Sequence, residues 1–345
     1  MGSEWVKKLA GEYGFELAGI TSAIPTADVG AFQNWARRGL AGEMAYLTDY
    51  RAELRLDPRR LLPSARSILC VGKLYNGPEP YSTRLSHEDL GWISRYAWGD
   101  DYHLIMRRSF NLLAAKMAEI AGPFEHKICI DTAPLLERSY ARLAGLGWIG
   151  KNTCLINQQR GSWFFLGELL TSLDLAPDTP PPDRCGTCTR CIDACPTVAI
   201  RPSPDSAAWE LDARLCISYF TIELRGNVPE ENREAMGNHL FGCDICQDVC
   251  PWNQRAPMSR EAAFAPREFA PPLARLAALT EEEFADVFRG SPVRRAKYRG
   301  FLRNVAIAMG NSGRPEFRAP LARLAESADE LVASHARWAL AELAK

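Results

Sequence analysis

Two cysteine-rich stretches organise this sequence: CGTCTRCIDACP at residues 185–196 and CDICQDVCP at residues 243–251. The first has the spacing C-x2-C-x2-C-x3-C-P. The second repeats it without the first cysteine, because Leu240 stands at that position. Cys216 is the nearby cysteine that can fill the gap. This spacing is typical of a protein that holds two [4Fe-4S] clusters.

The short gaps let three thiolates of one motif converge on one cluster, while the cysteine before proline binds the other. We therefore predict two ligand sets: Cys185, Cys188, Cys191 and Cys250 for one cluster, and Cys195, Cys216, Cys243 and Cys246 for the second. Two zinc sites or a disulfide framework are the alternatives. Zinc motifs usually pair two CxxC elements, which this run does not do. The remaining cysteines, in apolar stretches, are expected to be small buried hydrophobes: Cys70, Cys129 and Cys154.

The composition is that of an ordinary globular protein. The chain has 345 residues, of which 47% are hydrophobic and 24% charged, so two or three domains are expected. The N-terminus does not resemble a secretory signal, and no run approaches the roughly 18 apolar residues of a membrane helix. Iron–sulfur clusters also need reduced cysteine thiols as ligands. We therefore expect a cytoplasmic location.

The first 180 or so residues alternate between helical and extended patterns. Apolar spacing predicts helices over residues 4–13, 28–38 and 109–121, and strands over 15–21, 67–73 and 126–130. This alternation predicts a layered α/β sheet. The proline-rich segment Leu175 to Arg184 is the clearest linker, and it separates this part from the cysteine motifs.

Asp131 directly follows the last of these predicted strands. Open α/β sheets place ligand crevices at the carboxyl ends of their strands, so Asp131 is a candidate site residue. The alternative is a helix cap, since aspartate is a favoured N-cap and Pro134 suits an early helical position. Local sequence alone favours the cap.

Two further motifs do not support the chemistry they suggest. The glycine-rich stretch from Gly145 to Asn152 resembles a phosphate-binding loop, but asparagine replaces the hydroxyl that Mg²⁺ needs. We interpret it as a turn that allows close backbone approach to a ligand. Asp101 and His103 begin a pattern by which some corrinoid enzymes supply histidine to cobalt, yet Met106 replaces its glycine, so that ligation is not supported.

The C-terminal part, from about Pro272, reads as short helix pairs that resemble HEAT-type repeats. No acidic residue occurs between Asp286 and Glu316, whereas basic residues are frequent there. Most charge runs are solvated helix faces, but the absence of acids favours contact with phosphates. The expected nucleic-acid contacts are Arg294, Arg295, Lys297, Arg299 and Arg303.

Several segments together resemble one enzyme family. They are LDPRRLLPSARSIL (56–69), SRYAWGDDYH (94–103), IDTAPLLERSYARLAGLGWIGKNT (130–153), GSWFFLGELLTSLDL (161–175), CGTCTRCIDACPTVAI (185–200), LCISYFTIE (215–223) and FGCDICQDVCPWN (241–253). The family is that of the epoxyqueuosine reductases, the cobalamin-dependent iron–sulfur enzymes that perform the last step of queuosine formation in tRNA.

The resemblance implies an α+β protein in three parts: an α/β catalytic and cobalamin-binding domain over 1–178, a ferredoxin-like module with two [4Fe-4S] clusters over 179–255, and HEAT-like helices contacting tRNA over 256–345. Base-off cobalamin is the expected cofactor. Asp131 is implied as the proton donor, which overturns the local preference for a helix cap. Cobalamin or pocket neighbours are implied at Arg55, Ser94, Lys151 and Asn152.

The partners implied are a tRNA carrying epoxyqueuosine at the anticodon and an external low-potential electron donor. We expect a monomer that does not bind membranes. Two other functions stay open at this point. One is a reductive dehalogenase-like corrinoid enzyme acting on a small molecule. The other is a non-catalytic electron-transfer subunit, against which the 180-residue domain with Asp131 argues.

Overall fold

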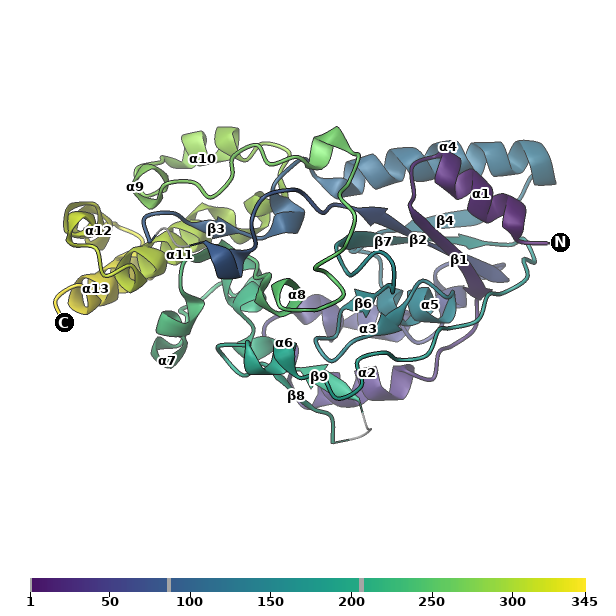
Figure 1. Ribbon diagram of the computed structural model, residues 1–345, viewed down its shortest axis with the longest axis horizontal. Helices are drawn as coiled ribbons and strands as arrows, with labels where there is room; N and C mark the ends of the chain where they lie inside the picture. The colour runs from purple at the N-terminus through teal and green to yellow at the C-terminus, as the bar shows by residue number, and fades with distance from the viewer. Residues whose placement is uncertain (1, 86–87, 205–207) are drawn as a thin grey trace.

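The computed structural model describes residues 2–85, 88–204 and 208–345. The molecule is elongated, with the N-terminus beside the main sheet at one end and the C-terminus among helices at the other (Figure 1). Its described helices are α1 (Glu4–Glu12), α2 (Val29–Arg37), α3 (Tyr50–Leu54), α4 (Tyr102–Ala121), α5 (Glu137–Leu143), α6 (Arg190–Asp193), α7 (Glu230–Arg233), α8 (Ile245–Asp248), α9 (Leu273–Leu276), α10 (Glu281–Val287), α11 (Lys297–Asn311), α12 (Arg318–Ala325) and α13 (Glu330–Glu342). None of the helices in these ranges is long and apolar enough to cross a bilayer.

The main sheet has four strands in the order β1-β2-β7-β4, and every neighbouring pair is antiparallel. These strands are β1 (Leu17–Ser22), β2 (Ser67–Leu74), β4 (His126–Cys129) and β7 (Phe164–Thr171). Three of the four match predicted strands. The strand rule used to place a crevice beside Asp131 applies to parallel sheets, so that argument was wrong even though Asp131 does follow β4.

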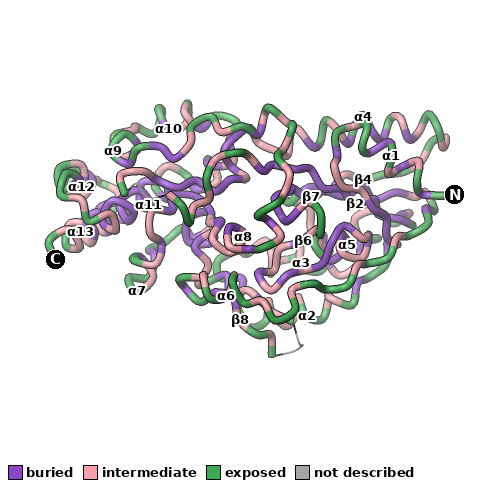
Figure 2. Tube along the Cα trace, viewed as in Figure 1, coloured by how far each residue is buried: buried purple, intermediate pink, exposed green. Residues whose placement is uncertain are grey.

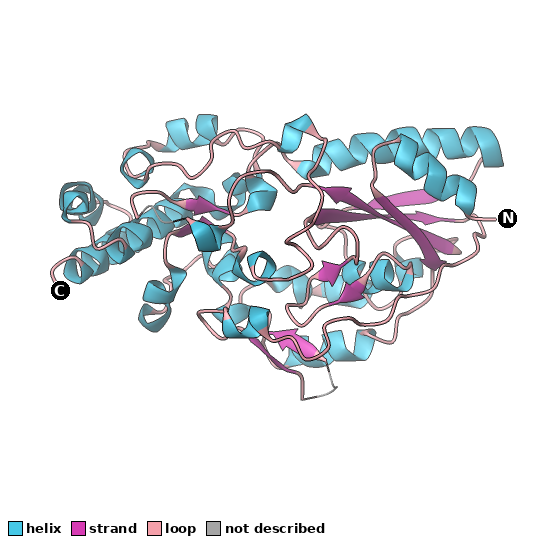
Figure 3. Cartoon of the chain, viewed as in Figure 1, coloured by secondary structure: helices cyan, strands magenta, loops and turns pink. Residues whose placement is uncertain are grey.

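Helices cover both faces of this sheet, as a layered architecture requires. One apolar core joins α1 and α4 to the sheet through Leu9, Phe110 and Leu169. A second core packs α5 on the opposite face, with Tyr140 against Ile68. The central strands β2 and β7 are buried along nearly their whole length (Figure 2), and Figure 3 shows the helices around the sheet.

Helix α4 begins earlier than the sequence pattern predicted. It starts at Tyr102, where Asp101 accepts a hydrogen bond from the backbone N–H of His103 at 3.0 Å. An N-cap of this kind satisfies a donor that the first turn leaves free. The pair that was tested as a cobalt-binding motif therefore starts a helix, and His103 lies in its first turn.

The proline-rich connection forms neither helix nor strand, as predicted, but it does not hang free. Asp178 accepts hydrogen bonds from the backbone N–H of Ile20 at 2.9 Å and from Lys7 Nζ at 2.7 Å. Leu175 is buried. This segment is thus packed along the edge of the sheet that β1 forms.

The cysteine motifs lie in a region of short elements. Helices α6 and α8 each precede the last cysteine of a motif. The small strands of the described chain pair as β3 (Trp92–Ile93) with β10 (His239–Phe241), β5 (Trp148–Ile149) with β6 (Leu155–Ile156), and β8 (Ile200–Pro202) with β9 (Trp209–Leu211). The parallel β3–β10 pair ties the segment before α4 to the segment that carries the second motif.

Helix α11 is the centre of the C-terminal part. Nearly all of its residues from Gly300 to Gly310 are buried. Its core also includes Trp92 and Trp98 from the N-terminal half and Phe241 next to the second cysteine motif. The helices that follow the cysteines therefore share one apolar core with both earlier parts of the chain.

Candidate active site

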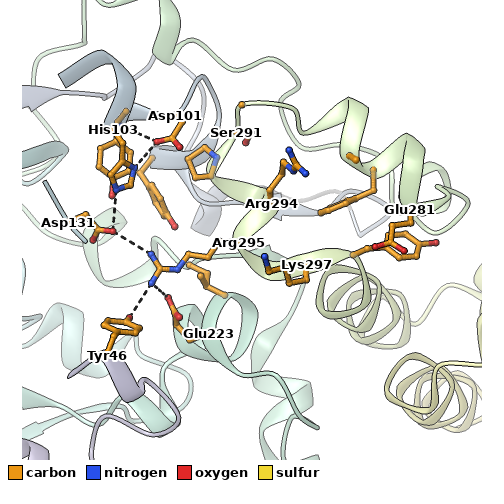
Figure 4. A pocket seen from close by; sticks show the side chains of 18 residues that line it. Tyr46, Asp101, His103, Asp131, Glu223, Glu281, Ser291, Arg294, Arg295 and Lys297 are labelled. Carbon is orange, nitrogen blue, oxygen red and sulfur yellow. Dashed lines mark hydrogen bonds and ion pairs between the residues drawn. The ribbon is translucent and has the colours of Figure 1, made fainter. Parts of the chain in front are cut away.

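A pocket of about 680 Å³ opens where the sheet domain, the segment after Cys216 and the C-terminal helices meet. Figure 4 shows side chains from these three parts pointing toward one another. Its aromatic and charged lining includes Tyr46, Tyr96, Asp101, Tyr102, His103, Asp131, Glu223, Glu281, Arg294, Arg295, Lys297 and Tyr298. Both the size and the mixture of aromatic and polar groups are usual for a ligand site.

Asp131 projects its carboxylate into this pocket. Its Oδ2 lies 3.5 Å from His103 Nε2 and 3.4 Å from Arg295 Nη1 (Figure 4). Helix α5 begins only at Glu137, after Leu136, so Asp131 does not cap it. The cap that local sequence favoured is therefore wrong.

The backbone of Asp131 is in the left-handed region, with φ of 47°. This conformation costs a non-glycine residue on the order of 1–3 kcal/mol and persists only where neighbouring groups impose it. The backbone N–H of Asp131 donates to Glu137 Oε1 at 2.5 Å. The aspartate is thus held in a strained loop at the pocket wall.

Asp131 and His103 form a charged pair. Burial alone would raise the pKa of Asp131, but the hydrogen bond from His103 and the charge of Arg295 lower it overall. Burial would lower the pKa of His103, yet its bonds to Asp101 and Asp131 raise it to about 9. His103 Nδ1 lies 2.7 Å from Asp101 Oδ1. At neutral pH the proton of this group accordingly resides on the imidazole, and Asp131 is ionised.

Arg295 joins this pair to the other side of the pocket. Its Nη2 lies 2.8 Å from Glu223 Oε1 and 3.3 Å from the Tyr46 hydroxyl. Glu223 ends the π-helical turn Tyr219–Glu223, which follows Cys216 after two residues. Such turns are frequent at functional sites. The turn places a carboxylate in the pocket within a few residues of a predicted cluster ligand.

The predicted nucleic-acid contacts do not form one surface. Arg294, Arg295 and Lys297 line the pocket. Arg299 is exposed and pairs with Asp329 at 2.9 Å.

Arg303 is 1% exposed, and its guanidinium donates to the backbone carbonyls of Leu224, Gly226 and Phe220. It cannot reach a phosphate, so this assignment was wrong. Arg303 instead fixes the segment that carries the π-helical turn.

The cysteines fall into two groups of electrostatic neighbours. The charges of Cys185, Cys188 and Cys250 act on Cys191. Those of Cys195 and Cys216 act on Cys243, and those of Cys243 and Cys216 act on Cys246. This grouping agrees with the two ligand sets that the cysteine spacing predicts, and the sets stay a prediction. Leu240 is fully buried in the apolar core of α11.

The two sets differ in their surroundings. We call the set with Cys185 the outer set, because exposed residues flank Cys185 and Cys188. We call the set with Cys216 the inner set, because the residues that follow Cys216, including Tyr219 and Phe220, are buried. The inner set lies in an apolar cluster with Phe220.

Cys154 was misread from the sequence. Cys70 and Cys129 are buried in the sheet as predicted, but Cys154 is a neighbour of Cys246, whose thiol lowers the pKa of Cys154. The side chain of Asn152 links the two backbones, since it accepts from Cys154 N at 3.2 Å and donates to Cys246 O at 3.3 Å. Only the mixed polar context of Cys154, next to Asn152 and Thr153, distinguished it from the two sheet cysteines.

The implied cobalamin neighbours lie outside the pocket lining. Lys151 Nζ donates to the carbonyls of Gly186 and Cys188, at 2.8 and 2.9 Å. Asn152, as described, bridges two cysteines. These two side chains brace the cluster loops.

Ser94 and Arg55 are likewise engaged with protein groups. The hydroxyl of Ser94 donates to Asp244. Arg55 donates to the backbone carbonyls of Tyr46 and Arg51. Each of them supports a segment near the pocket or the clusters. None of the four lines this pocket, and their contact with cobalamin stays a prediction.

The glycine-rich turn serves packing between protein segments. A Cβ at Gly147 would meet the carbonyl oxygen of Ile156 at 2.2 Å, and one at Gly150 would meet the Ile156 side chain at 2.5 Å. The close approach allowed by these glycines is to strand β6. The expectation of approach to a ligand was wrong.

Two family models match the chain. One, described as a 4Fe-4S double cluster binding domain, covers residues 184–253. The other, described as Epoxyqueuosine reductase QueG, DUF1730, covers residues 55–132. The first spans the complete predicted cluster motifs, and the second ends one residue beyond Asp131.

Solved structures similar to this fold include an epoxyqueuosine reductase with an epoxyqueuosine-modified tRNA-Tyr stem loop. It has a TM-score of 0.88 at 28% identity and covers 99% of this chain and 90% of its own. The Bacillus subtilis epoxyqueuosine reductase, at a TM-score of 0.87, 28% identity and the same coverage, has a catalytic loop, named for its aspartate, swung out of the active site.

Curated relatives cover almost the whole sequence. The epoxyqueuosine reductase of Xanthomonas campestris is 42% identical over 98% of this chain and 95% of its own length. That of Escherichia coli is 37% identical over 98% of this chain and 88% of its own length. By this likeness across its length, the chain belongs to the epoxyqueuosine reductase family.

Proposed function

We propose that this protein reduces the epoxide of epoxyqueuosine in tRNA to the alkene of queuosine, with two [4Fe-4S] clusters and cobalamin as cofactors. The observation that carries the proposal is the position of Asp131. It sits in a pocket that also receives Glu223, seven residues after the predicted cluster ligand Cys216. Proton supply and electron supply therefore meet at one place.

The pocket residues would suit a cobalamin bound beside Asp131. Tyr46, Tyr96 and Tyr102 offer aromatic surface to a flat conjugated ring. Among the described residues, the buried His103 Nε2 has only a long contact, 3.5 Å, with Asp131 Oδ2. A buried polar atom that is incompletely satisfied in this way is expected where a ligand belongs. When bound and reduced, cobalamin supplies a strongly reducing cobalt centre suited to opening a strained epoxide.

The cluster ligands we propose are the outer and inner cysteine sets defined above. Loaded clusters supply electrons one at a time. The outer set lies nearer the surface, and we propose that the external low-potential donor acts there. The inner set leads through the π-helical turn toward Glu223 and the pocket.

The chain's own residues supply the protons. Removal of the epoxide oxygen as water consumes two electrons and two protons. The breaking C–O bond builds negative charge on oxygen, which a nearby acid stabilises. We propose that the proton held on His103 Nε2 passes to Asp131 Oδ2 and from there to that oxygen, and that the second proton follows by the same route after solvent water has reprotonated His103. Arg295, whose Nη1 lies 3.4 Å from Asp131 Oδ2, then faces the developing charge.

We propose fewer tRNA-contacting residues than the sequence indicated. Arg294 and Lys297 line the pocket without a carboxylate partner within ion-pair distance in the described ranges. They are suited to the phosphates that flank an inserted base. We further propose that the helices after residue 256 form a HEAT-like platform for the rest of the stem loop, with 1–178 and 179–255 as the catalytic and cluster domains, and that the protein acts as a monomer in the cytoplasm.

The experiment that tests this function uses the full chain, reconstituted anaerobically with iron, sulfide and cobalamin. Iron and cobalt are counted, and epoxyqueuosine-containing tRNA is then incubated with a chemical reductant. We expect about eight iron atoms and about one cobalt atom per chain, and conversion of epoxyqueuosine to queuosine. A fully loaded protein that leaves epoxyqueuosine unchanged contradicts the proposal.

A further inference from the structure

Two ion pairs reach the side chain of Asp131, and neither is close. Both partners also have nearer carboxylates elsewhere: His103 lies 2.7 Å from Asp101, and Arg295 lies 2.8 Å from Glu223. These side chains keep most of their stabilisation if Asp131 moves away. They are therefore poor anchors for the loop between β4 and α5.

The backbone of this loop is tied to the rest of the protein more firmly at one point. Local bonds, such as Thr132 N to Ile130 O at 2.5 Å and Leu135 N to Ala133 O at 2.8 Å, tighten the loop on itself. The bond from Asp131 N to Glu137 Oε1 connects it to helix α5. Because Asp131 has a left-handed φ, its backbone relaxes unless such a bond holds it.

Glu137 lies on a well-packed helix, and its side chain makes no other hydrogen bond in the described chain. Its neighbours Ser139, Tyr140 and Ala141 are buried against the sheet, and the Tyr140 hydroxyl donates to Ile24 O at 3.0 Å. Within the described ranges, the bond to Asp131 is the one hydrogen bond of the Glu137 side chain, and no Arg, Lys or His lies within ion-pair distance of it.

We propose that Glu137 is a positioning residue: its carboxyl group latches the Asp131 loop in the pocket through the backbone N–H of Asp131. The role rests on the proposed function, since the latch matters for turnover only if Asp131 serves the reaction. A latch made of one acceptor also lets the loop open at the cost of a single hydrogen bond, while the strain at Asp131 is relieved. The loop can then admit substrate and close again.

The test compares three substitutions of Glu137 in the cluster-loaded full chain. Glu137→Gln keeps an acceptor oxygen at the same distance, Glu137→Met keeps the volume without an acceptor, and Glu137→Asp keeps a carboxyl group on a shorter side chain. Hydrogen–deuterium exchange is measured on the peptide that covers residues 130–136. Glu119→Ala, which removes an exposed carboxylate paired with Lys116 on α4, is the matched control.

We expect the Asp131 amide to exchange about tenfold faster in Glu137→Met and Glu137→Asp, because local opening becomes easier. Glu137→Gln and the control should exchange as the wild type does. In turnover assays kcat should fall about tenfold or more in the Met and Asp variants, with KM for tRNA unchanged, since a displaced catalytic group lowers the rate.

Wild-type exchange in both Glu137→Met and Glu137→Asp overturns the latch. If Glu137→Met loses cluster absorption and does not fold, the Glu137→Asp result decides alone. The exchange measurement does not depend on turnover. A wild-type protein that is inactive on epoxyqueuosine would therefore refute the proposed function, while the exchange rates of the Glu137 variants would still test the latch.

Discussion

The cluster sites and the pocket are built in opposite ways. Seven of the eight proposed cluster ligands come from two short stretches, 185–195 and 243–250. The pocket draws Tyr46, His103, Asp131, Glu223 and Arg295 from five separate segments. A cluster can therefore be assembled by local turns, whereas the pocket exists only when the sheet, the cluster segment and the C-terminal helices are packed together.

Because of this difference, substitutions at the cluster ligands and substitutions in the pocket should affect electron supply and proton supply separately. Damage to a ligand removes a cluster and, with it, turnover. Damage to a pocket residue should leave both clusters intact and affect only chemistry or tRNA binding.

Cys216→Ala should have the largest effect. Cys216 is the one proposed ligand outside the two motifs, and its loss leaves the inner cluster with three thiolates. We expect the iron content to fall from about eight to about four atoms per chain, with no measurable turnover. Iron analysis and electron paramagnetic resonance check this, and a variant that keeps two intact clusters would show that Cys216 is not a ligand.

Asp131→Asn should lower kcat by about 10² to 10⁴-fold, the usual contribution of a positioned acid. The amide keeps the size of the side chain but cannot deliver a proton. Cluster absorption and cobalamin content should match the wild type. Turnover of epoxyqueuosine-containing tRNA is the measurement, and wild-type turnover would falsify the proton-donor assignment.

The pocket's proton store should make turnover depend on pH. The pKa of His103 is raised to about 9, so its proton is fully present below the ordinary value of 6.5 and is lost as pH rises through about 9. We expect kcat to decline above about pH 9 in the wild type. In His103→Gln, kcat should fall by at most about tenfold, and it should not decline further above about pH 9. A wild-type profile that stays flat through pH 9 to 10 contradicts the assignment.

Sequence reasoning is most informative where function depends on nearby residues. Cysteine spacing predicts the cluster ligand sets because, within each motif, each cysteine is within about one turn of the next, and only Cys216 lies outside the motifs. Tyr46 and Glu223 gave no comparable signal, since their meeting with Arg295 depends on packing between distant segments. Strand β7 was missed because FFLGELLT is apolar on both faces and so lacks alternation.

Arg303 shows the same limit within a single helix. Arg299 and Arg303 are four residues apart and share a helix face, which read as a basic surface. Helix α11, however, is buried nearly all round, so Arg303 is enclosed while Arg299 lies near its exposed end. A run of basic residues therefore predicts a solvated helix face only where packing leaves one side of the helix exposed.

Arg294→Gln combined with Lys297→Gln should weaken tRNA binding without altering the clusters. Each lost phosphate contact reduces the magnitude of the slope of log K against log salt by about 0.7 to 0.9, so the slope of the double variant should be smaller in magnitude by roughly 1.4 to 1.8. Binding titrations at several salt concentrations measure this.

Arg303→Gln is the matched comparison for that double variant. It should leave the salt slope unchanged but destabilise the fold by about 1–3 kcal/mol, because buried carbonyls lose their donor. An unchanged slope in the double variant removes Arg294 and Lys297 from the tRNA interface.

Cys154→Ala should have the smallest effect. Once Cys246 binds iron, Cys154 carries the proton between the two sulfurs, and a hydrogen bond to a cluster sulfur favours the reduced state. Loss of about 1 kcal/mol corresponds to about 40 mV for one electron, so the inner potential should become more negative by that amount. Redox titration measures it, and an unchanged potential rejects the contact.

The most direct test of the account begins with clusters that are already reduced. Excess reductant is removed, epoxyqueuosine-containing stem loop is added to the cobalamin-loaded protein, and cluster absorption is followed. We expect the wild type to reoxidise its clusters as queuosine forms, with about two electrons consumed per epoxide. Clusters in Asp131→Asn should stay reduced over the same period. Reoxidation of that variant at the wild-type rate, with queuosine formed, would contradict the claim that electron delivery and the proton at Asp131 meet in one pocket.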